Sequence, residues 1–107
     1  FMATNVLRME LGPRSARKIV GKIAEDSSKV FFTHHAELRM VERRITRSQV
    51  LRCLRHGVVI EGPYRDTHGS WKLNMEVASA GSVITVVVVL DWRESIGDYA
   101  IVITTYL

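Results

Sequence analysis

The chain has one cysteine, two prolines and few aromatic residues, and its longest apolar run is only five residues, Val86–Leu90. A single cysteine excludes an internal disulfide, and a reducing compartment fits this composition. A five-residue run is far too short to span a bilayer as a helix, which takes about 20 residues. The sequence also shows no secretory leader. We therefore expect a cytoplasmic protein without a membrane segment.

Motifs of several enzyme classes are absent as well. We find no glycine-rich phosphate loop and no nucleophile elbow. Cys53 and His56 have a C-x-x-H spacing, to which His34 and His35 could add ligands. No second Cys pair and no carboxylate cluster accompanies them, and both are usual in metal sites. We therefore predict no metal ion and no other cofactor.

Positive charge is concentrated in the N-terminal half of the 107-residue chain. Residues 1–56 hold twelve Lys and Arg against five Asp and Glu, a balance of +7, whereas residues 57–107 have a balance of −3. Hydrophobic residues make up 47 %, which is typical of a globular protein. We expect a single domain, in which a basic helical segment at 1–30 precedes a core at 31–107. The charge asymmetry favours a polyanion, or an acidic protein, as partner.

The hydrophobic period is helical before Gly57 and extended after it. Three helices are expected, at about 14–25 with Pro13 in first position, at 33–44 with Thr33 as N-cap, and from a Thr46–Gln49 capping box to Gly57. Four strands are expected, at 58–61 before an interruption at Gly62-Pro63, at 71–77, at 83–90 in the centre, and at 98–106 with Ala100, Val102, Thr104 and Tyr106 on one face. A hairpin turn fits 79–82. This order predicts an α+β domain with N-terminal helices packed on a four-stranded antiparallel sheet.

The second predicted helix carries a ladder of one histidine and two arginines, His35, Arg39 and Arg43. Their four-residue spacing places them in one row along the helix surface. His35 can exchange a proton near neutral pH, and the guanidiniums can bind phosphate oxygens in pairs. A solvated basic helix face has the same spacing, so the ladder alone leaves both interpretations open. The residues expected to face the core are Leu38, Val41 and Ile45.

Three sequence blocks in fixed order resemble a known family. Residues 35–45 read His-Ala-x-x-Arg-Met-x-x-Arg-x-Ile, residues 58–64 read Val-Val-Ile-Glu-Gly-Pro-Tyr, and residues 103–106 read Ile-Thr-Thr-Tyr. The chain thereby resembles domain-of-unknown-function family 4258 over about residues 32–106. That family is similar to the RelE/ParE/BrnT-like group of bacterial toxins.

The resemblance implies a RelE/ParE-like fold and a metal-independent ribonuclease of toxin type. It further implies RNA as substrate and a helix-turn-helix antitoxin as partner. The site residues it marks are His35, Arg39, Arg43, Tyr64, Thr104 and Tyr106. The doubled histidine at 34–35 and the N-terminal helical segment depart from the family pattern.

Cleavage of RNA by its own 2′-hydroxyl needs a base, a proton donor and positive charge for the phosphorane. We expect His35 to act as base, with Arg39 and Arg43 as clamps, in a cleft also reached by Thr104 or Tyr106. The expected substrate-binding residues are Tyr64, Lys72, Arg17 and Lys18. The alternative is a non-catalytic module on the same fold that binds nucleic acid or an antitoxin-like partner. A structural protein that meets an acidic chain also remains open, since fold similarity does not settle function.

Overall fold

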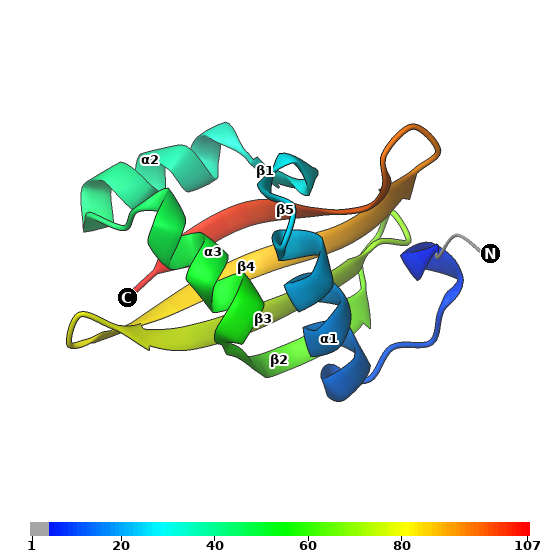
Figure 1. The fold of residues 1–107 in the computed structure, drawn as a ribbon, viewed down its shortest axis with the longest axis horizontal. Helices are drawn as coiled ribbons and strands as arrows, with labels where there is room; N and C mark the ends of the chain where they lie inside the picture. The colour runs from blue at the N-terminus through cyan, green and yellow to red at the C-terminus, as the bar shows by residue number, and fades with distance from the viewer. Residues whose placement is uncertain (1–4) are drawn as a thin grey trace.

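In the computed structural model, which describes residues 5–107, two helices cover one face of a five-stranded sheet and a third lies beside the sheet (Figure 1). The first four residues of the predicted N-terminal segment lie outside the described residues. The helices are α1 (Pro13–Ala24), α2 (His34–Arg43) and α3 (Arg47–His56), with short 3-10 helices η1 (Val6–Arg8) and η2 (Ser27–Lys29). The strands are β1 (Val30–Phe32), β2 (Val58–Arg65), β3 (Trp71–Ser79), β4 (Ser82–Arg93) and β5 (Gly97–Tyr106).

The caps of the helices follow the sequence signals. Pro13 is the first residue of α1. The Thr33 hydroxyl accepts a hydrogen bond from the Ala36 amide at the start of α2, and the Thr46–Gln49 capping box is formed at the start of α3. Side chains at these positions satisfy backbone amides that have no partner inside the helix. The predicted helix starts are therefore confirmed.

The sheet differs from the prediction in strand number and direction. Its order is β1-β5-β4-β3-β2, and β1 runs parallel to β5 while all other pairs are antiparallel. The prediction of four antiparallel strands is wrong because it omits β1. With only three residues, β1 is too short to show a strand period, and its pairing with Val30 opposite Ala100 is a long-range contact.

Strand β2 is longer than predicted, because it continues through Gly62-Pro63 to Arg65. The pairing with β3 shifts register on both sides of Glu61. A proline is tolerated here because β2 is the outermost strand, where one row of backbone amides has no partner strand. The hairpin turn between β3 and β4 falls where predicted, with Ala80 and Gly81 both at positive φ.

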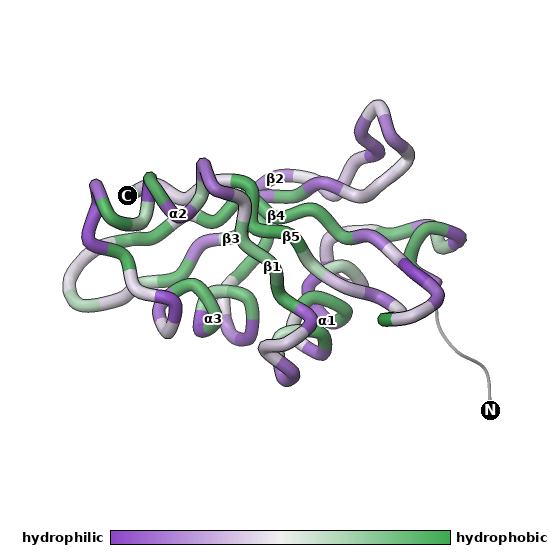
Figure 2. The backbone as a smooth tube through the Cα atoms, turned by 90° about the horizontal axis from the view of Figure 1, so that it is seen from above, coloured by the Kyte–Doolittle hydropathy of each residue, from purple (hydrophilic) through white to green (hydrophobic). Residues whose placement is uncertain are grey.

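One face of the sheet is covered by α1 and α3, which lie on the same side of it (Figure 2). Between helices and sheet lies the apolar core, to which β3 contributes Leu73 and Met75 and β4 contributes Val86 and Val88, all fully buried. We call this side the covered face and the other side the open face. The N-terminal segment closes one end of the core, since Trp71 donates its indole N–H to the carbonyl of buried Val6 at 2.9 Å. No helix among residues 5–107 is long and apolar enough to cross a membrane.

Helix α2 buries a different side from the predicted one. Its buried residues are Ala36 and Met40, whereas Leu38 is 50 % and Val41 78 % exposed. Ile45 is buried as predicted, but it follows the helix. Because α2 lies beside β5 rather than across the sheet (Figure 1), only a narrow stripe of the helix meets the protein. The prediction that Leu38 and Val41 face the core is therefore wrong.

Candidate functional site

The open face brings together polar side chains from three strands. Residues paired across neighbouring strands point to the same side of a sheet. Glu61 on β2 pairs with Asn74 on β3, Asn74 with Val87, and Val87 with Thr104 on β5, so one row crosses four strands. A second row begins with Tyr64 and Lys72. Tyr64, Lys72 and Thr104, predicted from separate parts of the sequence, thus lie on one face.

A register shift in β5 decides which residues reach the open face. Val102 pairs with Val88 on the covered face, but Thr104 pairs with Val87 on the open face. Ile103 is therefore one extra residue of β5 in its pairing with β4. Thr105 is buried, and Tyr106 is exposed on the open face. The prediction that Ala100 and Val102 share a face with Thr104 and Tyr106 is therefore wrong. Register shifts of this kind re-aim side chains and are common beside functional sites.

The same irregularity fixes the start of α2. The Thr33 amide donates to the carbonyl of Val102, and its hydroxyl donates to the carbonyl of Ile103 at 3.0 Å. The helix therefore departs from the point where β5 turns Thr104 toward the open face. Helix α2 and the last residues of β5 then run side by side.

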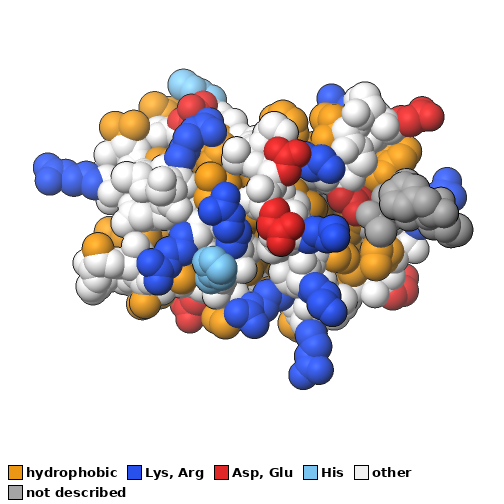
Figure 3. Space-filling view, in the orientation of Figure 1, with side chains coloured by type: hydrophobic (Ala, Val, Ile, Leu, Met, Phe, Trp, Pro, Cys, Tyr) orange, Lys and Arg blue, Asp and Glu red, His pale blue; other side chains and the backbone are white. Residues whose placement is uncertain are grey.

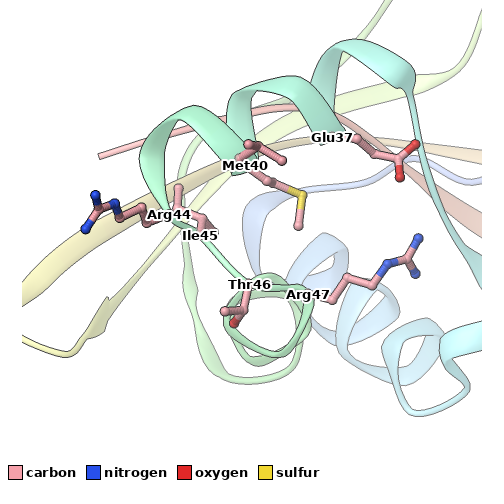
Figure 4. Close-up of a pocket in the computed structure, with 7 residues that line it drawn as sticks. Glu37, Met40, Arg44, Ile45, Thr46 and Arg47 are labelled. Carbon is pink, nitrogen blue, oxygen red and sulfur yellow. The ribbon is translucent and has the colours of Figure 1, made fainter.

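Helical geometry gives the direction of the ladder. Glu37 and Arg44 line a hollow of about 370 Å³ between α2 and the start of α3, together with Met40 and Ile45 (Figure 4). At about 100° per residue, His35 and Arg39 fall on the flank of α2 opposite Glu37. Since α3 lies over the covered face, this flank is directed to the side of the open face.

The ladder residues differ in environment. His35 is exposed, and within residues 5–107 no hydrogen bond engages its side chain. Arg39 is partly buried and donates to the Glu42 carboxylate at 2.6 Å. Arg43 is exposed at the C-terminal end of α2. The structure therefore places His35 and Arg39 on the side of Thr104 and Tyr106 without a direct hydrogen bond between them.

A carboxylate that the sequence analysis did not select, Glu61, lies on the open face at the edge strand β2. The Tyr64 hydroxyl donates to Glu61 Oε1 at 3.3 Å, and the Asn74 amide donates to Oε2 at 3.5 Å. Glu61 belongs to the Val-Val-Ile-Glu block, but only the register with β3 reveals that it faces Asn74. Glu61 and Asn74 are thus additions to the predicted residues.

The protonation state of Tyr64 follows from these neighbours. Its pKa is raised, first by partial desolvation, then by the negative charge of Glu61 and the hydrogen bond to it, and finally by Tyr106. The contribution of Tyr106 places the two phenol groups within electrostatic reach on the open face. A tyrosine with a raised pKa stays protonated at neutral pH, so Tyr64 can donate a hydrogen bond or a proton and cannot serve as a base.

Two predicted substrate-binding residues lie elsewhere. Arg17 and Lys18 belong to α1, on the covered side of the sheet. The Arg17 guanidinium donates to the carbonyl of Gly57 at 2.7 Å and to that of His56 at 3.4 Å, so it caps the C-terminal end of α3. Neither residue is grouped with Tyr64 and Thr104. Among residues 5–107, no three His, Cys, Asp or Glu side chains lie close enough together to hold a metal ion.

Comparison with known proteins gives one match. A family model described as a domain of unknown function (DUF4258) matches residues 32–107, which is well over half of the chain. The matched region runs from the end of β1 to the C-terminal residue and includes every open-face residue discussed above, while α1 precedes it. No curated protein and no solved structure matches the chain.

Proposed function

This chain belongs to the DUF4258 family, and we propose that it is a metal-independent ribonuclease of toxin type. The observation that carries the proposal is the direction of the α2 flank with His35 and Arg39 toward the side of the sheet that bears Thr104 and Tyr106. This arrangement supplies a base, a phosphate clamp and proton donors around one surface. A relationship to the RelE/ParE toxins, a cytoplasmic location and a helix-turn-helix antitoxin are parts of the same proposal.

In the proposed reaction, the 2′-hydroxyl of a ribose attacks the adjacent phosphorus. A new P–O2′ bond forms, the P–O5′ bond breaks, and a 2′,3′-cyclic phosphate and a 5′-hydroxyl result. His35 accepts the proton of the 2′-hydroxyl, and the phenol of Tyr106 on β5, the strand beside α2, donates a proton to the leaving O5′. Tyr64, on the far strand β2, would instead donate a hydrogen bond to another part of the RNA, since its raised pKa keeps it protonated.

Arg39 is proposed to stabilise the phosphorane with paired hydrogen bonds, which guanidinium makes to phosphate. Its present partner, Glu42, is exposed. Exposed ion pairs contribute only about 0–1 kcal/mol, so phosphate can replace Glu42 at little cost. Arg43 lies further along the helix and would contact a neighbouring phosphate.

The test is single-turnover cleavage of a mixed RNA panel in excess chelator. His35→Ala should lower the rate on the order of 10² to 10⁴-fold, the usual contribution of a general base. His34→Ala, His56→Ala and His68→Ala are matched controls that should change it little. Arg39→Lys should also slow cleavage, because lysine keeps the charge but cannot form the paired contact. Complete loss of activity with chelator, or equal rates for His35→Ala and wild type, would refute the proposal.

One observation favours a second candidate function. A general base is usually oriented by a hydrogen bond to a third group, and among the described residues His35 has no such partner. A non-catalytic module that binds nucleic acid or an antitoxin-like protein on the same surface needs no oriented imidazole. Binding of RNA without cleavage of any panel member would establish this alternative.

A further inference from the structure

Helices α1 and α3 form a basic groove on the covered side of the sheet, away from the open face. Its volume is about 690 Å³, similar to that of a small-ligand site. The lining residues are Arg14, Arg17, Lys18, Gly21, Lys22, Glu25, Arg55 and His56. Figure 3 shows Lys and Arg side chains spread over this side of the molecule. The lining thus holds five permanent cations and one carboxylate.

The cations of the groove have two different roles. Two of them bridge the helices, since Arg17 donates to the carbonyl of Gly57 at 2.7 Å and Arg55 donates to the carbonyl of Ala24 at 3.0 Å. Arg14, Lys18 and Lys22 are exposed, and within residues 5–107 no hydrogen bond or ion pair engages their side chains. The bridging arginines hold the groove in shape, while these three cations remain available to a ligand.

The spacing of the three available cations indicates an extended ligand. Arg14, Lys18 and Lys22 follow one another at intervals of four residues, which places them in a row with steps of about 6 Å along α1. Consecutive phosphates of one nucleic-acid strand are separated by a comparable distance. A compact anion would need only one or two of these charges.

The side chains that line the groove fit a nucleic acid better than they fit a protein partner. Stable protein interfaces have an apolar centre that is depleted of charged residues. The groove has no hydrophobic side chain among its lining residues, and all except Gly21 are charged or titratable. Phosphate backbone binding, in contrast, relies on Lys and Arg without apolar contacts.

We propose that the α1–α3 groove is a binding site for the phosphate backbone of a single nucleic-acid strand. Its available cations come from α1, which precedes the region matched by the family, so family membership does not imply this site. Helices α1 and α3 lie on one side of the sheet (Figure 2), so the groove that their residues line is on the side opposite the open face. The site therefore operates whether or not the open face cleaves RNA.

The test measures affinity for a fluorescent 2′-O-methyl RNA strand, which cannot be cleaved, and for single-stranded DNA of the same length. The groove variant is Arg14→Glu/Lys18→Glu/Lys22→Glu. At low salt we expect its affinity to fall on the order of tenfold to a hundredfold for both probes. The slope of log affinity against log salt should decrease by about 2, since each single-strand phosphate contact contributes about 0.7.

A matched control carries the same charge change outside the groove. Arg8→Glu/Arg44→Glu/Arg52→Glu also lowers the formal net charge of +4 by six, and none of the three lines the groove. It should retain most of the affinity and of the salt slope. Glu25→Lys is the converse variant, because it removes the only carboxylate of the lining, and it should bind both probes more tightly.

Three results would overturn the proposal. They are absence of binding by the wild-type chain, equal losses in the groove and control variants, and tighter binding of polyglutamate than of either strand. The last result would indicate an acidic protein instead. Circular dichroism verifies that each variant is folded, and Arg14→Gln/Lys18→Gln/Lys22→Gln replaces the groove variant if charge reversal unfolds it. Probe binding by the groove variant tests this site, and cleavage of unmodified RNA by the wild-type chain tests the proposed reaction, so failure of the one is distinguishable from failure of the other.

Discussion

The covered and open faces of the sheet are built from the same strands but differ in the chemistry of their side chains. On β3, Leu73 and Met75 are fully buried under the helices, while Lys72 and Asn74 alternate with them on the open face. On β4 the alternation disappears, because Val87 and Val89 are only 7 % and 8 % exposed although no helix covers them. Their cross-strand neighbours are Asn74 and Thr104 for Val87, and Lys72 and Ile101 for Val89.

Because the two faces differ in this way, we expect the covered face to determine stability and the open face to determine binding. The covered face holds a continuous apolar core, in which each side chain has many neighbours. On the open face, groups that can donate or accept hydrogen bonds, such as Tyr64, Glu61 and Thr104, lie on the strands to either side of the apolar residues of β4. Substitutions on the covered face should therefore change folding, and substitutions on the open face should change function.

The largest expected effect is at Leu73. Leu73→Ala should lower the free energy of unfolding by about 2–5 kcal/mol, because it removes a fully buried side chain and leaves a cavity. The neighbour Lys72→Ala, on the open face, should change it by less than about 0.5 kcal/mol. Urea unfolding of the two variants measures both values. Similar losses would show that the two faces are energetically equivalent.

A smaller loss is expected where the N-terminal segment closes the covered face. Trp71→Phe should cost about 1–3 kcal/mol of unfolding free energy, because the buried carbonyl of Val6 loses its hydrogen-bond donor. Trp92→Phe is the matched control, since Trp92 is only partly buried and its indole makes no hydrogen bond within the described residues. Thermal unfolding of both variants provides the comparison. If Trp92→Phe lowered the free energy of unfolding as much as Trp71→Phe, loss of the hydrogen bond would not explain the effect of Trp71→Phe.

On the covered face, Thr105 is a polar exception. It is 1 % exposed, and its Oγ1 has no hydrogen-bond partner among the described residues. Thr105→Val should raise the free energy of unfolding by about 1 kcal/mol, because it replaces an unpaired hydroxyl with a methyl group of similar size. Thr104→Val, the adjacent open-face substitution, should not stabilise the protein. Destabilisation by Thr105→Val in chemical denaturation would contradict this expectation.

The smallest effect concerns the pH dependence of folding. Burial of the Cys53 side chain on the core side of α3, with a further contribution from Glu76, raises the pKa of its thiol to about 12, against about 8.5–9 in an unfolded chain. The folded state therefore holds this proton where the unfolded state loses it, and stability falls as the pH rises between about 9 and 12. The loss amounts to about 1 kcal/mol between pH 9 and 10. Cys53→Ala should show a correspondingly shallower decline, and identical slopes in urea unfolding would exclude this assignment.

The sequence by itself determined the local structure of this protein. Caps such as Thr33, Thr46 and Pro13 specify helix starts, because each satisfies or avoids nearby backbone amides. Alternation of apolar and polar residues specifies strand β3. The change of the hydrophobic period at Gly57 specifies the α+β class, and the turn at 79–82 specifies the hairpin. The motif blocks identified the family region, and they selected Tyr64, Thr104 and Tyr106 as candidate site residues.

Only the tertiary structure decided which groups meet. Strand β1 exists because three residues pair with distant β5, and the extra residue Ile103 sends Val102 and Thr104 to opposite faces. Neither the pairing of β1 with β5 nor the extra residue in β5 produces a periodic pattern of apolar residues in the sequence. The edge position of α2 leaves Val41 exposed, and the packing of α1 on α3 separates Arg17 from the open face. Local patterns depend on residues a few positions apart, whereas register and packing depend on residues far apart in the chain, so the sequence specified the elements and the tertiary contacts specified their partners.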